Sequence, residues 1–261
     1  GGYWSWDPVE NSSLMPWLTA TAFLHSAAVQ ERRGVMRSWS FPLVVLTFEL
    51  TIFGTFLTRS GVVSSVHAFA RSPLGYYFLA FIGLSSAAVA WIAHRRREMF
   101  GPGGSIVPAL SREGTTLLGT LVLCTLCSAT FFGTMLPVLS EVFTGTKVAV
   151  GPGFFGRVFA PLAVLMLLLM GVCPLTSWGR TSALLRRLSV PLVAAFFCVS
   201  LPLVLKIRNP YLTSASFFGG LVLGGVLSQV YRSSRAGGLR TILRDGREME
   251  LQVTLGERPR S

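Results

Sequence analysis

The sequence predicts an all-α protein, a polytopic membrane helix bundle of about seven transmembrane helices. Of its 261 residues, 51% are hydrophobic and only 13% are charged, whereas a soluble domain carries about 25% charged residues. The chain also contains several uninterrupted apolar runs of about 18 residues or more, long enough to cross the ~30 Å of bilayer hydrocarbon. Both observations exclude an ordinary soluble domain.

The predicted spans follow one another along most of the chain, and turn signals separate them. The motif ERRG follows the first span and FGPGGS the third, GPGFFG precedes the fifth, and RNPY precedes the seventh. The first span has a helix-start signature: Asp7 as N-cap, Pro8 at the first helical position and Glu10 completing a capping box. The predicted spans lie near residues 9–30, 38–58, 73–93, 115–139, 157–175, 190–206 and 214–231.

The net charge of +12 comes from basic residues that cluster between the apolar runs. This pattern orients a membrane protein, so we expect no nucleic-acid partner. One side of the membrane would carry Arg32, Arg33, Arg37, Arg95, Arg96, Arg97, Arg112, Arg180, Arg186, Arg187, Arg232, Arg235 and Arg240, and the other Arg59, Arg71, Lys147, Arg157, Lys206 and Arg208. The richer side is expected to face inward, which places the N-terminus outside and the C-terminus inside.

This topology predicts a membrane domain over residues 1–231 and a basic inner-face tail over 232–261. Two outer segments stand out, a Trp-rich loop (1–8) and an amphipathic loop (59–72). No cleavable signal peptide is expected, since the chain opens on a polar, aromatic loop. The cysteines all fall inside apolar runs, where small buried side chains are expected rather than disulfides; they are Cys124, Cys127, Cys173 and Cys198.

Trp4 and Trp6 admit two interpretations. They could anchor the chain in the aromatic belt at the membrane surface. They could instead form a platform, next to the flexible Gly1 and Gly2, that stacks against a planar ligand.

The histidines favour a ligand. His67 lies in the outer amphipathic loop, and an imidazole beside an aromatic platform is what an axially ligated haem requires; a solvated surface histidine is the alternative. His25 lies within the first span. Three roles are open to it: metal ligand, proton relay or structural hydrogen-bonding group. Glu49, deep in the second span, is either a relay group or a buried hydrogen-bonding group. His94 is expected only to reach the inner surface with its arginine neighbours.

At this point the residues resemble a known family. The stretch GGYWSWDPVENSSLMPWLTATAFLHS is similar to the tryptophan-rich WWD signature of haem-handling proteins, specifically of CcmF-type cytochrome c haem lyases. ERRG, GTFLTRSGVVSSVHAFARSPLGYY and GTMLPVLSE…GPGFF resemble segments that follow that signature. The resemblance runs from Gly1 to about Trp178 and covers the middle portion of such a lyase.

The resemblance implies a function in cytochrome c maturation. Haem from the chaperone CcmE would be presented at the outer membrane surface for thioether attachment to the CxxCH cysteines of apocytochrome c. Gly1, Gly2, Trp4, Trp6 and Asp7 would bind this haem and His67 its iron, while His25 would bind the iron of a b-type haem (haem b) in the membrane. Family sites use two histidines per haem and only one of each pair is present, so the chain is expected to be incomplete alone.

The implied location is the bacterial cytoplasmic or mitochondrial inner membrane, where the protein would be multi-pass. The implied partners are CcmE, apocytochrome c, other maturation subunits, the missing parts of the same lyase and membrane lipid. The alternative function is a transporter or proton-conducting subunit with His25 and Glu49 as relay groups.

Overall fold

The computed structural model describes residues 3–34, 37–62, 74–100, 111–176 and 188–235. These residues form seven α-helices and two short 3₁₀ helices, and no strand occurs among them. The helices are α1 (Pro8–Arg33), α2 (Arg37–Ser60), α3 (Leu74–Arg95), η1 (Arg97–Phe100), α4 (Arg112–Thr144), α5 (Pro152–Val172), η2 (Cys173–Leu175), α7 (Ser189–Val204) and α8 (Pro210–Arg235). The all-α prediction is confirmed, and each predicted span overlaps one α-helix.

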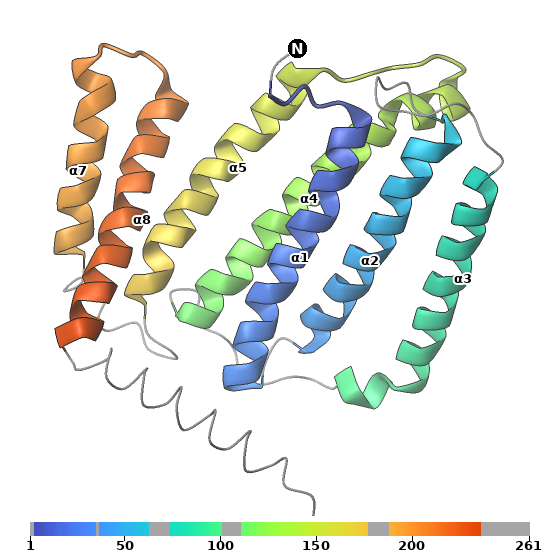
Figure 1. The fold of residues 1–261 in the computed structure, drawn as a ribbon, viewed down its shortest axis with the longest axis horizontal. Coiled ribbons are helices and arrows are strands. Elements are labelled where there is room, and N and C mark those ends of the chain that lie inside the picture. The colour runs from blue at the N-terminus through green and yellow to red at the C-terminus, as the bar shows by residue number, and fades with distance from the viewer. Residues whose placement is uncertain (1–2, 35–36, 63–73, 101–110, 177–187, 236–261) are drawn as a thin grey trace, which may run out of the picture.

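The α-helices stand side by side and alternate in direction (Figure 1). The N-terminal loop therefore lies at the same end of the bundle as the end of α2, the start of α3, and the α4–α5 and α7–α8 connections. We call this the loop end of the bundle. That it faces outward stays a prediction from the basic residues.

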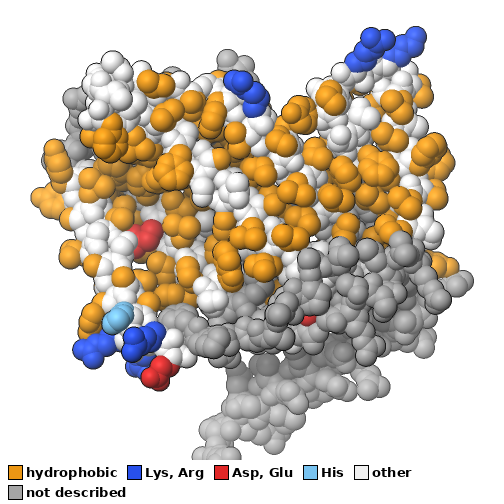
Figure 2. All heavy atoms as spheres, turned by 180° about the vertical axis from the view of Figure 1, so that it is seen from behind, with side chains coloured by type: hydrophobic (Ala, Val, Ile, Leu, Met, Phe, Trp, Pro, Cys, Tyr) orange, Lys and Arg blue, Asp and Glu red, His pale blue; other side chains and the backbone are white. Residues whose placement is uncertain are grey.

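Five helices are long and apolar enough to cross a membrane: α2, α3, α4, α5 and α8. Figure 2 shows hydrophobic side chains over the middle of one face, with Lys and Arg side chains towards its ends. The other two helices fall short for different reasons. α7 is apolar but has 16 residues, about 24 Å of helix, whereas α1 has 26 residues but a more polar sequence. Seven crossings therefore remain a prediction.

Polar side chains of α1 hydrogen-bond across its contact with α2. Thr47 Oγ1 donates to Thr19 Oγ1 at 2.9 Å, and the Ser26 and Ser40 hydroxyls lie 3.1 Å apart. Because hydrocarbon offers no hydrogen-bond partners, such groups bond across helix interfaces. The core of the bundle lies at the same junction, where buried Met15, Leu18, Ala22, Leu43, Leu50, Val122, Leu123, Leu126 and Cys127 pack together.

Helices α7 and α8 approach closely through two glycines of α8. A Cβ on Gly220 would lie 2.6 Å from the Ala195 Cα, and one on Gly224 would lie 2.6 Å from the Pro191 Cα. Glycines spaced four residues apart allow such backbone contact between membrane helices. All four cysteines are free thiols; Cys127 is buried as predicted, whereas Cys124, Cys173 and Cys198 are only partly buried.

Candidate functional site at the N-terminal loop and on helix α1

The loop that precedes α1, residues Tyr3–Asp7, is fixed by hydrogen bonds to the first turn of the helix; we call it the Trp loop. The Asp7 side chain accepts from Val9 N at 3.1 Å, and Glu10 Oε2 accepts from Asp7 N at 3.1 Å. The predicted capping box is thus present. Glu10 Oε2 also accepts from Ser5 N at 2.9 Å and Ser5 Oγ at 3.1 Å. One carboxylate therefore holds the loop on both sides of Trp6.

Trp6 turns inward and anchors the Trp loop. Its ring stacks on Phe155 of α5, with centroids 4.6 Å apart and 3° between the planes, and meets Phe159 edge-on at 4.6 Å. Its backbone has φ 60°, a left-handed conformation that costs a non-glycine residue about 1–2 kcal/mol. A hydrogen bond of 3.1 Å from Asn11 Nδ2 to the Trp6 carbonyl helps to hold it.

Trp4 and Tyr3 form the accessible surface of the loop. The Trp4 ring meets Trp6 edge-on with centroids 6.1 Å apart and is 38% exposed, and Tyr3 is fully exposed. The structure thus brings Trp4, Trp6 and Asp7 together at the loop end of the bundle. Of the two tryptophans, Trp4 is the exposed one and Trp6 is half-buried.

Beneath Trp6 lies a pocket of about 270 Å³ between α1, α4 and α5. We call it the Asn11 pocket; its lining includes Trp6, Asn11, Thr134, Glu141, Lys147 and Phe155. Asn11 Nδ2 donates to Thr134 Oγ1 at 3.0 Å, which joins α1 to α4. The sequence analysis did not single out Asn11 or Thr134, because their contact spans 123 residues of sequence.

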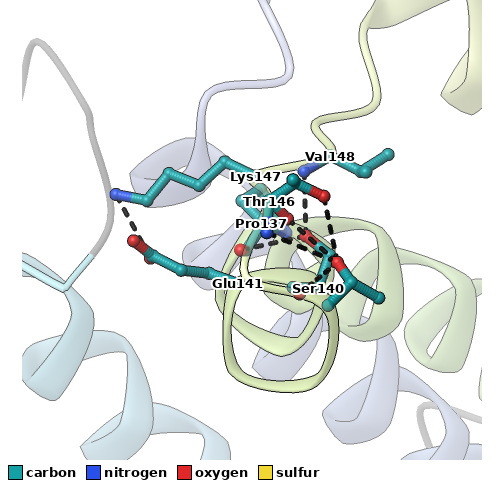
Figure 3. A network of polar contacts seen from close by, with 7 residues as sticks. Pro137, Ser140, Glu141, Thr146, Lys147 and Val148 are labelled. Atoms are coloured by element: carbon teal, nitrogen blue, oxygen red, sulfur yellow. Dashed lines mark hydrogen bonds and ion pairs between the residues drawn. The ribbon is translucent and has the colours of Figure 1, made fainter.

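The connection after α4 is pinned back onto that helix (Figure 3). Ser140 Oγ accepts from Val148 N at 2.8 Å and donates to the Pro137 carbonyl at 3.1 Å. Lys147 Nζ pairs with Glu141 Oε2 at 3.3 Å. These contacts place an ammonium and a carboxylate at the edge of the Asn11 pocket.

His25 lies on an exposed side of α1, well away from the Trp loop. Its Nδ1 is 2.7 Å from the Thr21 carbonyl oxygen. Since a carbonyl only accepts, Nδ1 carries a proton, and in the neutral imidazole Nε2 then keeps its lone pair. Leu24 and Trp17 of the same helix are also exposed, 65% and 62% respectively. A histidine held this way is suited to ligate a metal through Nε2.

Glu49 has a partner that the sequence did not reveal. Ser85 Oγ of α3 donates to Glu49 Oε1 at 2.8 Å. Among the described residues, His25 is hydrogen-bonded to its own helix and Glu49 to α3. Among the residues that the structure describes, no group of three or more His, Cys, Asp or Glu side chains could hold a metal ion. A single imidazole instead suits a metal already held in a macrocycle.

Several predicted features lie outside the described residues. They are Gly1, Gly2, His67, most of the outer loop 59–72 and nearly all of the tail 232–261. The roles given to them stay predictions.

Comparisons with known proteins agree with one another. A family model described as cytochrome C assembly protein matches residues 1–64. The chain is 38% identical over 242 residues to the cytochrome c-type biogenesis protein ccl1 of Rhodobacter capsulatus, covering 91% of this chain and 36% of that protein. It is 38% identical over 229 residues to CcmF of Escherichia coli, covering 86% of this chain and 34% of CcmF. The solved structure named cytochrome c heme lyase CcmF superposes with a TM-score of 0.66 at 35% identity.

The chain belongs to the CcmF family of cytochrome c-type biogenesis proteins. The CcmF structure match covers 92% of this chain and 35% of that protein. A CycK protein of Bradyrhizobium diazoefficiens is 44% identical over 181 residues, which cover 69% of this chain and 27% of CycK. The chain therefore spans about a third of the length of its CcmF-family relatives. The Trp loop and α1 lie within the region that the family model matches.

Proposed function

We propose that this CcmF-family chain forms the haem-handling part of a cytochrome c haem lyase, presenting haem at the outer membrane surface for thioether attachment to apocytochrome c. One observation carries the proposal. Helix α1 bears a rigidly held aromatic loop at its start and, further along, an imidazole with a free Nε2 on its exposed side. The two features match the two haem positions that the family resemblance implies.

At the Trp loop, haem is the substrate. The accessible Trp4 ring offers a flat apolar face for the porphyrin, and Trp6 and Asp7 hold that face in place. In this proposal, His67 of the outer loop would bind the haem iron. Thioether formation adds a cysteine S–H across a haem vinyl group: sulfur bonds to one vinyl carbon, and the hydrogen ends on the other. No described side chain needs to act as acid or base, because fixing the porphyrin beside the thiols reduces the entropic cost of their approach.

In the membrane, His25 would hold haem b through Nε2. The site fits in two respects, since the Thr21 carbonyl fixes the tautomer and the surrounding helix surface is exposed and apolar. When bound, haem b supplies an electron for keeping the substrate iron reduced. A second ligand would then come from elsewhere in the lyase, which agrees with a chain that covers about a third of its relatives' length.

The partners follow from the reaction: the haem chaperone CcmE as donor, apocytochrome c as acceptor, and other maturation subunits together with the remaining parts of the lyase. The protein would work in the bacterial cytoplasmic membrane or the mitochondrial inner membrane.

The experiment is a reduced-minus-oxidised absorption spectrum of the full-length protein purified in detergent. We expect a b-type haem signal that His25→Ala abolishes and that the matched variant His94→Ala leaves unchanged. An unchanged signal in His25→Ala would exclude His25 as a ligand, and a haem-free wild type would exclude the membrane haem.

A further inference from the structure

Helices α2 and α3 enclose a groove between their halves that lie away from the loop end. Near the loop end the two helices are in close contact, since a Cβ on Gly75 would lie 2.9 Å from the Ser60 Cβ. Halfway along, Ser85 Oγ of α3 donates to Glu49 Oε1 of α2 at 2.8 Å. Beyond this bond the helices move apart (Figure 1), and a hollow of about 580 Å³ lies between them. We call it the α2–α3 groove.

The walls of the α2–α3 groove are mainly hydrocarbon. They include Phe41, Val45, Leu46, Val89, Ala90 and Ala93. The two alanines of α3 leave space that larger side chains would fill. Walls of this kind offer almost no hydrogen bonds, so they suit a ligand that buries apolar surface.

The length of the groove matches one leaflet of a membrane. The apolar segment of α2 is Ser38–Ser60, and the groove is lined from Ser38 to Glu49, which is half of that segment. This half is about 16 Å of helix, close to half of the ~30 Å thickness of bilayer hydrocarbon. A hydrocarbon chain that enters from the end of the bundle would therefore reach mid-membrane and stop at the Ser85–Glu49 bond.

Three arginines follow the groove at its open end. Arg95, Arg96 and Arg97 come directly after the groove-lining segment of α3, and all three side chains are exposed. The helical hydrogen bonding continues to Arg96, whose N–H donates to the Ile92 carbonyl at 2.9 Å. Because Arg96 is three residues after Ala93, it continues the helix face that lines the groove. Figure 2 shows Lys and Arg side chains gathered below the hydrophobic surface at its lower left.

The surroundings of the arginines are those of a membrane–water boundary. The Arg95 guanidinium lies over the ring of Trp91, 5.4 Å from the centroid, and Trp91 is 62% exposed. Tryptophan is enriched at this depth of a membrane. One acid, Glu98, accompanies the three arginines in this segment, so the open end of the groove attracts anions.

We propose that the α2–α3 groove binds one acyl chain of an anionic phospholipid, whose phosphate pairs with Arg96 and Arg97. Guanidinium groups bind phosphate well, and basic clusters between membrane helices are typical sites for anionic lipid headgroups. The length of the groove fits the chain of a lipid in the adjacent leaflet, and the charge fits its headgroup. The inference goes beyond the proposed function and does not depend on it, because it concerns α2 and α3 only.

The test is native mass spectrometry of the full-length protein, delipidated in detergent and titrated with phosphatidylglycerol or phosphatidylcholine of equal chain length. We expect the first phosphatidylglycerol to bind more tightly than phosphatidylcholine. Replacing both arginines, Arg96→Gln with Arg97→Gln, should weaken phosphatidylglycerol binding about fivefold per arginine and leave phosphatidylcholine binding unchanged. Ala90→Leu should weaken the binding of both lipids about tenfold, because its side chain takes the place of about two buried methylene groups.

Two matched variants serve as controls. Ala88→Leu adds the same side chain to the opposite face of α3, and Arg208→Gln removes an exposed arginine at the loop end. Both should bind phosphatidylglycerol like the wild type. Equal affinity of the wild type for the two lipids, unchanged binding in the double arginine variant, or equal binding in Ala90→Leu and Ala88→Leu would overturn the proposal.

Two further outcomes would assign the groove to another ligand and so overturn the proposal. Competition by glycerophosphoglycerol at the concentration of the lipid would indicate a site for the phosphate alone, without an acyl chain. Absence of phosphatidylglycerol binding, together with a lower unfolding midpoint in Ala90→Leu than in Ala88→Leu, would indicate that another helix of the full-length protein fills the groove. The haem spectrum of the double arginine variant should equal that of the wild type, so the two proposals succeed or fail separately.

Discussion

The indole of Trp6 lies parallel to the ring of Phe155, with 3° between the planes and 4.6 Å between the centroids. This contact joins the loop before α1 to the first turn of α5. The two tryptophans in the Trp loop therefore have different roles. Trp6 holds the loop against the bundle, and Trp4 provides its accessible aromatic face.

Substitution at the two tryptophans should therefore have different effects. Trp6→Ala removes the stacked contact with Phe155 and the edge-on contact with Phe159. We expect the free energy of unfolding to fall by about 2–3 kcal/mol. This is at the low end for a large aromatic residue, because the ring is half-buried. Trp4→Ala should cost less than about 1 kcal/mol but weaken haem binding to the full-length protein. Denaturant titration in detergent, combined with haem titration, measures both. A larger loss of stability in Trp4→Ala would reverse this assignment.

Asp7 should act mainly as a helix cap. Asp7→Ala removes the oxygen that accepts from Val9 N, so we expect a loss of about 1 kcal/mol of stability. Asp7→Asn keeps a capping oxygen and should lose only a few tenths of that amount. Thermal unfolding of the two variants separates the cap from the charge. Equal losses would show that the negative charge, and not the hydrogen bond, stabilises the helix start.

Gly133 should not tolerate a side chain. An added Cβ would lie 2.8 Å from the Phe155 ring, and because Phe155 also supports Trp6, the ring cannot shift freely. Overpacking of this kind costs about 1–3 kcal/mol. Gly83→Ala is the control, since a Cβ there meets nothing within 4 Å. We expect Gly133→Ala to lower the unfolding midpoint and Gly83→Ala to leave it unchanged or raise it; similar midpoints would argue against the close contact.

The α7–α8 contact offers a comparison between adjacent residues. Gly220→Leu would force the helices apart, whereas Gly219→Leu places its side chain where nothing lies within 4 Å of the Cβ. We expect the first variant to lose about 2 kcal/mol or more and the second to change little. Cysteines introduced on the facing surfaces of the helices provide the measurement, since their crosslinking should fall only in Gly220→Leu. Crosslinking that is retained in Gly220→Leu would contradict the packing.

Local patterns accounted for most of what the sequence predicted. Runs of apolar residues located the helices, and the residues from Asp7 to Glu10 were enough to predict the capping box. Each of these patterns lies within a few consecutive residues or a single helix. Such local patterns do not show where a helix lies in the bundle or which helices are its neighbours.

The partly wrong or missing predictions all depend on those neighbours. A pattern of two tryptophans cannot show that Phe155 covers one of them. Nor could it reveal that Asn11 bonds to Thr134 or that Ser85 donates to Glu49, because each pair joins different helices. The polar sequence of α1, which lowered its hydropathy, reflects its position between α2 and α4.

Helix α1 runs without interruption from the Trp loop to His25 and beyond. Asp7 and His25 are about 18 residues apart, which at 3.6 residues per turn is about five whole turns and about 27 Å. The loop and the imidazole are therefore in phase around the helix axis. Inserting or deleting one residue between them would rotate His25 by about 100° relative to the loop. A change in length within this segment would therefore alter the angle between the loop and the imidazole far more than the distance between them.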